Sequence, residues 1–217
     1  MKNPSPKQQQ LAENIVTATS TLITEGGLAA ATVRAISEKV GASAPQIYRL
    51  FEDIHGVYAC VALALLNEHV AQQEEPNDPV KALHHMIVTL IEFGLNNYEL
   101  YLHISRPAHR RKPNLWKAQS DILAAKIENV ATAGRLRVDE AHALVVILPL
   151  CAGLILSTIQ RTSHPTHLQW LVWQIVDPLV RNDLLEERFA GEPAALAGAL
   201  AANIAQIKVL TPGEQAI

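Results

Sequence analysis

The amino-acid sequence predicts an all-α protein with a small N-terminal helical domain and a larger C-terminal one. Three observations support this fold class. Hydrophobic residues make up 49% of the 217 residues while aromatic residues make up 5%, and the helix formers Ala and Leu are plentiful. Apolar residues recur at spacings of three and four, and no run of alternating Val-, Ile- and Thr-rich segments predicts a sheet. Polar capping residues followed closely by proline mark several helix starts.

Three helices are predicted within residues 6–52. Each begins after a Ser or Thr that can cap its first turn, and glycine ends the first two. The cap and end residues are, in order, Ser5 with Gly26, Thr32 with Gly41, and Ser43 alone. Because isolated helices as short as the second and third are marginal in water, we expect them to fold together with the first as one compact unit.

Seven further helices are predicted by the same signals, and the first of them leads out of the N-terminal unit. Six of them begin after Asp53, at Pro79, near Asn97, near Pro113, after Asp139 and at Leu168, and a last Ala-rich helix covers about 194–209. Asp177-Pro178 either kinks or restarts the helix that begins at Leu168. Pro149 lies inside the most apolar helix and should bend it or free one carbonyl. We place the domain boundary between residues 1–54 and 55–217.

Charge and apolar patterning limit the classes of function. The net charge is −3, so the whole chain is not a basic nucleic-acid coat. Residues 1–50 hold five bases against three acids, a formal +2, which leaves room for a local basic face. The uncharged stretch Ala143–Ile159 has 17 residues and contains Pro149, whereas a membrane span needs about 20. We therefore expect a buried helix there and no membrane partner.

The two cysteines, Cys60 and Cys151, stand alone in apolar stretches. They form neither a metal-ligand spacing nor a disulfide framework, so we expect two buried thiols in a reducing compartment. The N-terminus is polar and carries no signal-peptide core. Together these features predict a cytoplasmic protein.

Two short helices joined by a tight glycine-containing turn, over residues 33–51, have the spacing of a helix-turn-helix. In that motif the second helix lies in the DNA major groove, with its first residues at base edges. Ser43 and Gln46 can hydrogen-bond to bases, and Gln can pair with adenine. Ala44 and Pro45 can touch a thymine methyl group, whereas Tyr48, Arg49 and the helix start at Thr32 can bind phosphates. The same spacing also fits an ordinary helical hairpin.

Four short motifs within residues 15–58 keep fixed spacings. They are Glu-Gly at 25–26, Thr-Val-Arg-x-Ile at 32–36, Val-Gly-x-Ser at 40–43 and Ile-Tyr-Arg-x-Phe at 47–51. In combination they resemble the DNA-binding domain of TetR-family transcriptional repressors, over roughly residues 8–70. Beyond residue 70 the resemblance is one of layout only.

The resemblance implies a ligand-responsive homodimer that binds a palindromic double-stranded DNA operator. The C-terminal helices would bind an unknown small-molecule effector and hold the dimer together, and repression is the family default. Carried over by position, Thr32 and Tyr48 would contact phosphates and Arg34 a phosphate or a base. The major groove would face Ser43, Ala44, Pro45 and Gln46.

Two residues depart from the family pattern. The family usually has His two residues after the tyrosine and Lys six residues after it, where this chain has Leu50 and Ile54. Both positions face phosphates, so we expect weaker DNA binding and a flatter dependence on salt. His55 can substitute in part, more so when it is protonated below about pH 6.5.

The resemblance also implies a ligand pocket among the helices of residues 78–175. Its candidates are amphipathic residues on apolar stretches, namely Met86, Phe93, Tyr98, His103, Trp116 and Trp170. For each of them, plain core packing is the alternative and the favoured explanation. The apolar stretches 143–159 and 168–180 fit a four-helix dimer interface, or alternatively the core of a monomer.

Other chemistry has little support. No glycine-rich phosphate loop, nucleophile elbow or paired metal-binding motif is visible, so we expect neither an enzyme with catalytic residues nor a cofactor. The adjacent His84 and His85 diverge by about 100° on a helix, and His164 and His167 lack further ligands, so no metal site is expected. The basic cluster at 106–112 is a solvated loop or a site of attraction for an anionic ligand. The alternative function is a small-molecule- or protein-binding helical dimer that has lost DNA recognition.

Overall fold

The computed structural model describes residues 5–105, 114–160 and 168–180, with the backbone alone at 157–160, 169 and 170. The described residues are helical, with one isolated antiparallel bridge between Leu136 and Val180 and no β-strand among them. The prediction of an all-α fold is therefore confirmed. The basic cluster at 106–112, His164, His167 and the helix expected at 194–209 lie outside the described residues.

The N-terminal helices begin and end where the capping residues predict. Their bounds are α1 (Pro6–Gly26), the 3₁₀ turn η1 (Leu28–Ala30), α2 (Val33–Val40) and α3 (Ala44–Phe51). The Thr32 hydroxyl accepts a hydrogen bond from the backbone N–H of Ala35 at 3.2 Å, and Gly41 ends α2 with φ of 68°. This left-handed conformation favours glycine. Ile15, Ile36 and Ile47 are fully buried and hold the three helices together.

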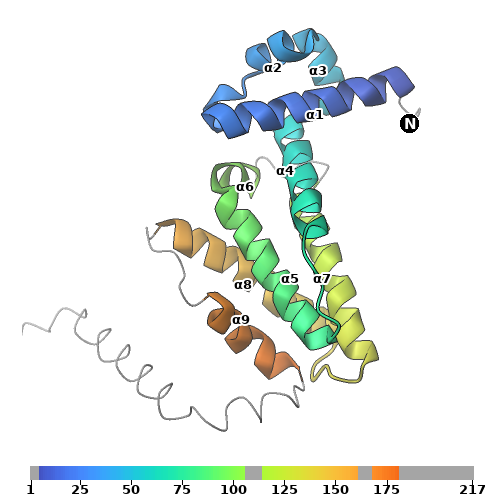
Figure 1. The fold of residues 1–217 in the computed structure, drawn as a ribbon, viewed down its shortest axis with the longest axis vertical. Helices are drawn as coiled ribbons and strands as arrows, with labels where there is room; N and C mark the ends of the chain where they lie inside the picture. The colour runs from blue at the N-terminus through green and yellow to red at the C-terminus, as the bar shows by residue number, and fades with distance from the viewer. Residues whose placement is uncertain (1–4, 106–113, 161–167, 181–217) are drawn as a thin grey trace, which may run out of the picture. The chain divides into compact units, whose positions relative to one another are not determined.

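Helix α4 (Ile54–Ala71) leads away from the N-terminal helices (Figure 1). Asp53 caps it and accepts a hydrogen bond from the N–H of Gly56 at 2.9 Å. Along its length α4 packs against α1 and α3 and against three helices of the C-terminal part, α5 (Pro79–Asn96), α6 (Tyr98–Ser105) and α7 (Leu115–Thr132). Its core side chains, Val57, Val61 and Leu66, are fully buried. Helix α4 thus packs against both the N-terminal helices and the C-terminal helices.

The C-terminal helices pack around α5. It contacts α7, α8 (Glu140–Gln160) and α9 (Leu168–Val176). Gly94 allows the closest approach, because a Cβ atom there would lie 2.5 Å from the Cδ1 atom of Ile155 on α8. Helix α8 begins after Asp139, which accepts a hydrogen bond from the N–H of His142 at 2.8 Å, and it continues through Pro149.

Two expectations are wrong in detail. The helix that begins at Leu168 ends at Val176, and a 3₁₀ turn, η3 (Asp177–Leu179), follows it. Pro178 lacks the N–H that a continuing helix needs. The carbonyl of Leu179 instead accepts a hydrogen bond from the N–H of Arg137 at 2.9 Å. Cys151 is buried as expected, but Cys60 is only half-buried.

Among the described residues, α4 alone is long and apolar enough to cross a membrane by length and composition. The core helix of a water-soluble protein passes the same test. Because α4 packs against helices on several sides, its apolar character is explained by core packing.

The described residues all belong to one compact unit, which extends from residue 1 to residue 180. The expected boundary between residues 54 and 55 falls at the start of α4, and it stays a prediction. What the contacts show is that α1 and α3 are joined to the rest by packing against α4, and a hydrogen bond joins η1 to Glu99 of α6.

A partly buried carboxylate holds the start of α5. Asp78 accepts hydrogen bonds from the N–H groups of Val80 at 3.0 Å and Lys81 at 2.9 Å, and it forms an ion pair with Arg135. Partial burial by itself would raise the pKa of Asp78. The hydrogen bonds from Lys81, Arg135 and Val80 and the charge of Arg135 outweigh that effect, so the pKa is lowered.

We predict that Asp78→Ala lowers the free energy of unfolding by about 2 kcal/mol at neutral pH, because it removes both the helix cap and the ion pair. Asp78→Asn keeps a capping oxygen and should lose about half as much. Because the folded-state pKa is lowered, the stabilisation is complete above the unfolded-state pKa of about 3.9 and is lost as the pH falls through the folded-state value. Urea unfolding at several pH values measures it.

The matched control is Asp121→Asn. Asp121 pairs with Lys117, but the two side chains are 63% and 72% exposed, so the pair contributes little. Equal stability of Asp78→Asn and the unmodified protein at neutral pH would contradict the role given to the Asp78 charge.

Candidate nucleic-acid interface and ligand cavity

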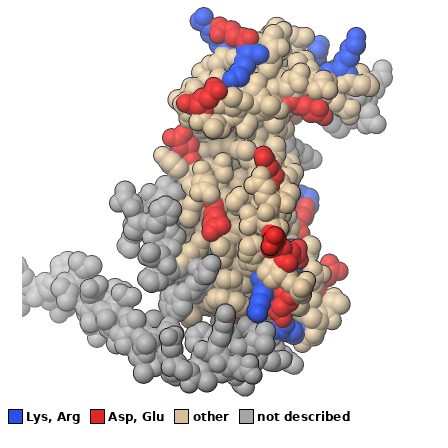
Figure 2. All heavy atoms as spheres, viewed as in Figure 1, with Lys and Arg blue, Asp and Glu red and all other residues tan. Residues whose placement is uncertain are grey.

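Helix α3 buries one face and presents the other to solvent. Ile47 is fully buried, whereas Tyr48 is 45% exposed. Ser43, Pro45 and Arg49 are also exposed, and Ala44 and Gln46 are half-buried. The six residues predicted for this helix therefore lie at its start or on its outer surface. Figure 2 shows Lys and Arg side chains at the end of the molecule formed by α1–α3, with acidic side chains between them.

Gln46 has a structural task in the absence of DNA. Its Oε1 atom accepts hydrogen bonds from the backbone N–H of Ser43 at 2.8 Å and from the Ser43 hydroxyl at 2.9 Å. This contact is the return half of a capping box. A bidentate pair with adenine needs the same oxygen as an acceptor. Gln46 must therefore leave the cap, or share its oxygen, before it can read adenine in that way.

The start of α2 offers two further polar groups. Thr32 and Arg34 are both exposed. The Thr32 oxygen accepts from the Ala35 N–H, which leaves the hydroxyl hydrogen available to a phosphate. Arg34 forms an ion pair with Glu38, with Nε and Oε1 2.8 Å apart and the side chains 88% and 66% exposed. So exposed a pair contributes little, and the guanidinium can exchange it for a phosphate.

The turn between α3 and α4 fixes the direction of α3 relative to α4. The N–H of Asp53 donates to the carbonyl of Phe51 at 2.8 Å, across Glu52 with φ of 66° and ψ of −51°. This is a γ-turn with positive φ, a rare and strained conformation for a residue with a side chain. A Cβ atom on Gly56 would lie 2.0 Å from the same carbonyl oxygen, so only glycine fits there. The ends of α3 and α4 are therefore held in direct contact.

Side chains of α4 and α6 also anchor η1 and its neighbours. The hydroxyl of Tyr58 on α4 donates to the carbonyl of Ala31 at 3.1 Å. Glu99 on α6 accepts a hydrogen bond from the N–H of Leu28 at 3.2 Å. Burial raises the pKa of Tyr58, which keeps its hydroxyl a donor across the neutral range. The N-terminal helices are thus fastened at two points besides the α3–α4 turn.

His55 and His103 meet at this junction. The Nδ1 atom of His55 lies 2.7 Å from the Nε2 atom of His103, and the two rings are stacked with centroids 4.8 Å apart. A residue expected at DNA phosphates and a residue expected in the ligand pocket therefore contact each other. The phosphate role of His55 stays a prediction, and in this arrangement its Nδ1 atom faces α6. Nothing in the local sequence links two residues 48 positions apart.

Leu50 and Ile54, the two residues that depart from the family pattern, have a packing role. Leu50 and Ile54 are half-buried and pack against the hydrophobic core. They add apolar packing at the end of α3 and the start of α4. Neither side chain can donate a hydrogen bond to a phosphate.

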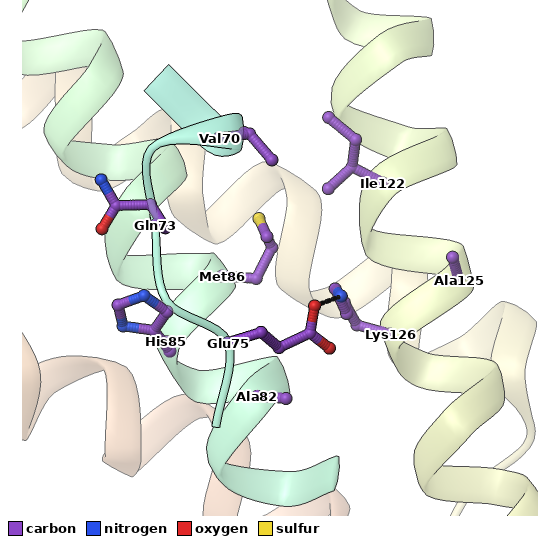
Figure 3. A pocket seen from close by; sticks show the side chains of 9 residues that line it. All are labelled: Val70, Gln73, Glu75, Ala82, His85, Met86, Ile122, Ala125 and Lys126. Carbon is purple, nitrogen blue, oxygen red and sulfur yellow. Dashed lines mark hydrogen bonds and ion pairs between the residues drawn. The ribbon is translucent and has the colours of Figure 1, made fainter. Parts of the chain in front are cut away.

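A half-open cavity lies between the end of α4, the start of α5 and the middle of α7 (Figure 3). Its volume is about 270 Å³. The apolar part of its wall is formed by Val70, Ala82, Met86, Ile122 and Ala125. The polar part is formed by Gln73, Glu75, His85 and Lys126. Such an apolar cavity with a few polar groups has the character of a small-molecule site.

Met86 is the member of the predicted ligand set that lines this cavity. Phe93 is 1% exposed within the core, Tyr98 is 45% exposed on α6, and Trp116 is half-buried on α7 with its ring 6.4 Å from that of Tyr101. The side chain of Trp170 lies outside the described residues. Local patterning could not single out Glu75 and Lys126, because they are 51 residues apart and meet only in the fold. Within the described ranges, no group of three or more His, Cys, Asp or Glu is arranged to hold a metal ion.

Comparison with known proteins agrees with the N-terminal geometry. Residues 15–59 match the sequence profile of the bacterial regulatory proteins of the tetR family. The N-terminal domain is a TetR-family helix-turn-helix domain. The match covers α1 from Ile15, both helices of the motif and the first turns of α4. A comparison with curated protein sequences gives no match.

Solved structures with the same fold extend over most of the chain. RolR in complex with resorcinol has a TM-score of 0.64 at 16% identity, covering 88% of this chain and 97% of RolR. A TetR transcription regulator from Haloarcula marismortui has a TM-score of 0.55 at 18% identity, covering 79% and 99%. A TetR-family regulator from Haemophilus influenzae has a TM-score of 0.52 at 16% identity, covering 81% and 100%. At these identities the similarity shows a TetR-like all-α fold.

We predict that Gln46→Glu weakens binding to a specific DNA site about tenfold or more while leaving α3 folded. A carboxylate oxygen still accepts from the Ser43 N–H, but the amide donor is lost and a negative charge is added at the groove. Gln46→Ala should weaken binding too and also lower the thermal stability, because it removes the cap. Fluorescence anisotropy and thermal unfolding measure the two effects separately.

Gln72→Glu, at the far end of α4, adds the same charge away from the TetR-family domain and serves as the control. It should leave DNA affinity within about twofold. If Gln46→Glu binds DNA as tightly as the unmodified protein, Gln46 does not contribute to the interface.

Proposed function

We propose that the protein is a homodimeric, ligand-responsive transcriptional regulator, with repression as the expected mode. It would bind a palindromic operator through α3 and be released by a small molecule. The observation that carries this proposal is the solvent-exposed face of α3 within a domain that matches the tetR family. Cytoplasmic localisation follows from this function.

The groups at the surface of α2 and α3 divide into two kinds. Ser43, Pro45 and Gln46 lie at the start of α3, the part of a recognition helix that meets base edges. Thr32, Arg34, Tyr48 and Arg49 supply hydroxyl and guanidinium donors suited to phosphates on either side of the groove. The first kind would set sequence preference and the second the register on the duplex.

A dimer is supported by the two faces of α8. One face is buried in the protomer, at Ala143, Ile147, Cys151 and Ile155. The opposite face exposes an apolar stripe that consists of Val145, Pro149, Gly153 and Leu156. Val145 is 72% exposed and Leu156 is 38% exposed, and a Cβ atom on Gly153 would meet nothing within 4 Å. A second copy related by a two-fold axis would cover this stripe with the same stripe of its own.

Ligand response is supported by the position of α4. Its first turn is held against the end of α3, and its last turn forms part of the cavity wall. A ligand that prefers one position of α4 would shift the population between forms that can and cannot bind two half-sites. RolR, which shares the fold, is described with bound resorcinol, a small molecule. The effector of this protein is therefore sought among small molecules.

We predict that Val145→Glu weakens the dimer about 100-fold, because burying an unpaired carboxylate at both copies of the interface is costly. Since Val145 is 72% exposed in the protomer, the substitution should leave the protomer folded. Analytical ultracentrifugation over a concentration series measures the dissociation constant. Circular dichroism reports the helical content.

Ala124→Glu places the same new charge on an exposed position of α7 and is the control. It should leave the dissociation constant unchanged. A monomeric unmodified protein, or an unaltered dimer in Val145→Glu, would remove the α8 stripe as the interface.

We predict sequence-dependent binding to DNA flanking the protein's own gene, with a shallow dependence on salt. Ile54→Lys restores a phosphate-side cation and should steepen the slope of log K against log salt by about 0.9 for each protomer. Anisotropy titrations at several salt concentrations measure both quantities, and effector release is then sought by adding small molecules to the complex.

A steep slope for the unmodified protein would contradict the expected loss of phosphate contacts at Leu50 and Ile54. Binding no tighter than to random DNA, both at this region and in a genomic selection for sites, would favour the second candidate. That candidate is a helical binding dimer without DNA recognition, and the apolar Leu50 and Ile54 are the observation behind it.

A further inference from the structure

The cavity described above contains one cation, Lys126 of α7. Its side chain is 15% exposed, and its charge is matched by Glu75, which is 52% exposed. Figure 3 shows the two side chains reaching toward each other from α7 and from the connection between α4 and α5, residues 72–78. The two partners are therefore not equivalent, because one charge is largely removed from water and the other is not.

This asymmetry decides which partner can be replaced. A largely buried ammonium group needs a counter-charge, since an uncompensated charge away from water is costly. Glu75 can return to water at little expense because half of its side chain is already solvated. An incoming anion can thus take the place of Glu75 at Lys126 without leaving any buried charge unpaired.

The remaining wall selects the rest of such a ligand. Five of the nine lining residues are apolar, and Met86, with its flexible thioether, adapts to ligands of different outline. A volume of about 270 Å³ falls just below the roughly 300–1,000 Å³ typical of sites for drug-sized ligands, so a compact molecule fits best. The Nε2 atom of His85, which also lines the cavity, is buried with no hydrogen-bond partner among the described residues. It is a second polar group in the cavity wall, besides Lys126.

We propose that this cavity binds a small monocarboxylic acid with an apolar ring or short acyl chain, whose carboxylate replaces Glu75 at Lys126. Glu75 imitates the ligand's carboxylate when the cavity is empty and must be displaced for binding. The apolar body lies against Met86 and Ile122. Charge pairing at Lys126 and burial of the apolar body both contribute to the affinity for the acid.

Displacement of Glu75 has a consequence for α4. Two ion pairs hold the connection between α4 and α5. Glu75 pairs with Lys126 of α7, and Asp78 pairs with Arg135 just after α7. The ligand breaks the first and leaves the second, so the end of α4 is loosened while the start of α5 stays in place. This step rests on the function proposed above, whereas binding of the acid does not.

The test is isothermal titration calorimetry on the full-length protein without DNA. The probes are benzoate and hexanoate, each compared with its neutral amide. Both acids should bind, and both amides should bind at least tenfold more weakly, because only the acids carry the charge that Lys126 requires. Glu75→Gln removes the competing carboxylate and should tighten acid binding about tenfold. Lys126→Met should weaken acid binding at least tenfold and leave the amides unchanged.

Two variants serve as matched controls. Glu74→Gln changes the neighbouring exposed carboxylate, and Lys117→Met changes an exposed lysine of the same helix, α7. Neither should alter the affinity for the acids. Glu75→Gln keeps the proposal testable even if Lys126→Met fails to fold, since its side chain is half-exposed.

The proposal is overturned if the amides bind as tightly as the acids, if neither acid binds at millimolar concentration, or if Glu75→Gln leaves acid affinity unchanged. Anisotropy with operator DNA separates this failure from failure of the proposed function. Acids that bind without releasing DNA would leave the site assignment intact and remove the regulatory step. If other compounds release the DNA and neither acid binds, the proposed class of ligand is wrong and the proposed function stands.

Discussion

The contact between the Phe51 carbonyl and Gly56 is the constraint on which the remaining geometry depends. It places the end of α3 directly on the first turn of α4, and the γ-turn at Glu52 fixes the angle between them. A side chain at residue 56 would push the two helices apart, and no rotamer could avoid the clash because it involves a backbone atom. The end of α3 and the first turn of α4 are therefore held in direct contact.

Both ends of α4 are tied to other elements, but the ties differ in kind. At the DNA-binding end, Tyr58 holds Ala31, Glu99 holds Leu28, and His55 meets His103. The bonds of Tyr58 and Glu99 fasten the N-terminal helices to α4 and α6, and the His55–His103 contact joins α4 to α6. At the other end, ion pairs join the connection at residues 72–78 to Lys126 of α7 and to Arg135 just after α7. A small molecule with a charge can compete with an ion pair more readily than with a buried backbone hydrogen bond.

Charge placement follows the same division. Arg34 and Glu38 are exposed, so their pair is weak and a phosphate can replace Glu38 with little change in stability. Lys126, Asp78 and Arg135 are each less than a quarter exposed. In the Asp78–Arg135 pair both partners are needed, because removing either one leaves a poorly solvated charge behind. The exposed Glu38 and the half-exposed Glu75 are the partners that another anion can replace.

The helices and their starts could be predicted from the sequence alone. Ser5, Thr32, Ser43, Asp53 and Asp78 cap helices where expected, because capping depends on residues a few positions away. The helix-turn-helix and its exposed residues followed from the same local spacing. Tertiary structure decided the rest. It placed Gln46 in a cap, joined His55 to His103, and brought Glu75 to Lys126 across 51 residues. Contacts between distant residues depend on how helices pack, and helix periodicity carries no information about which faces meet.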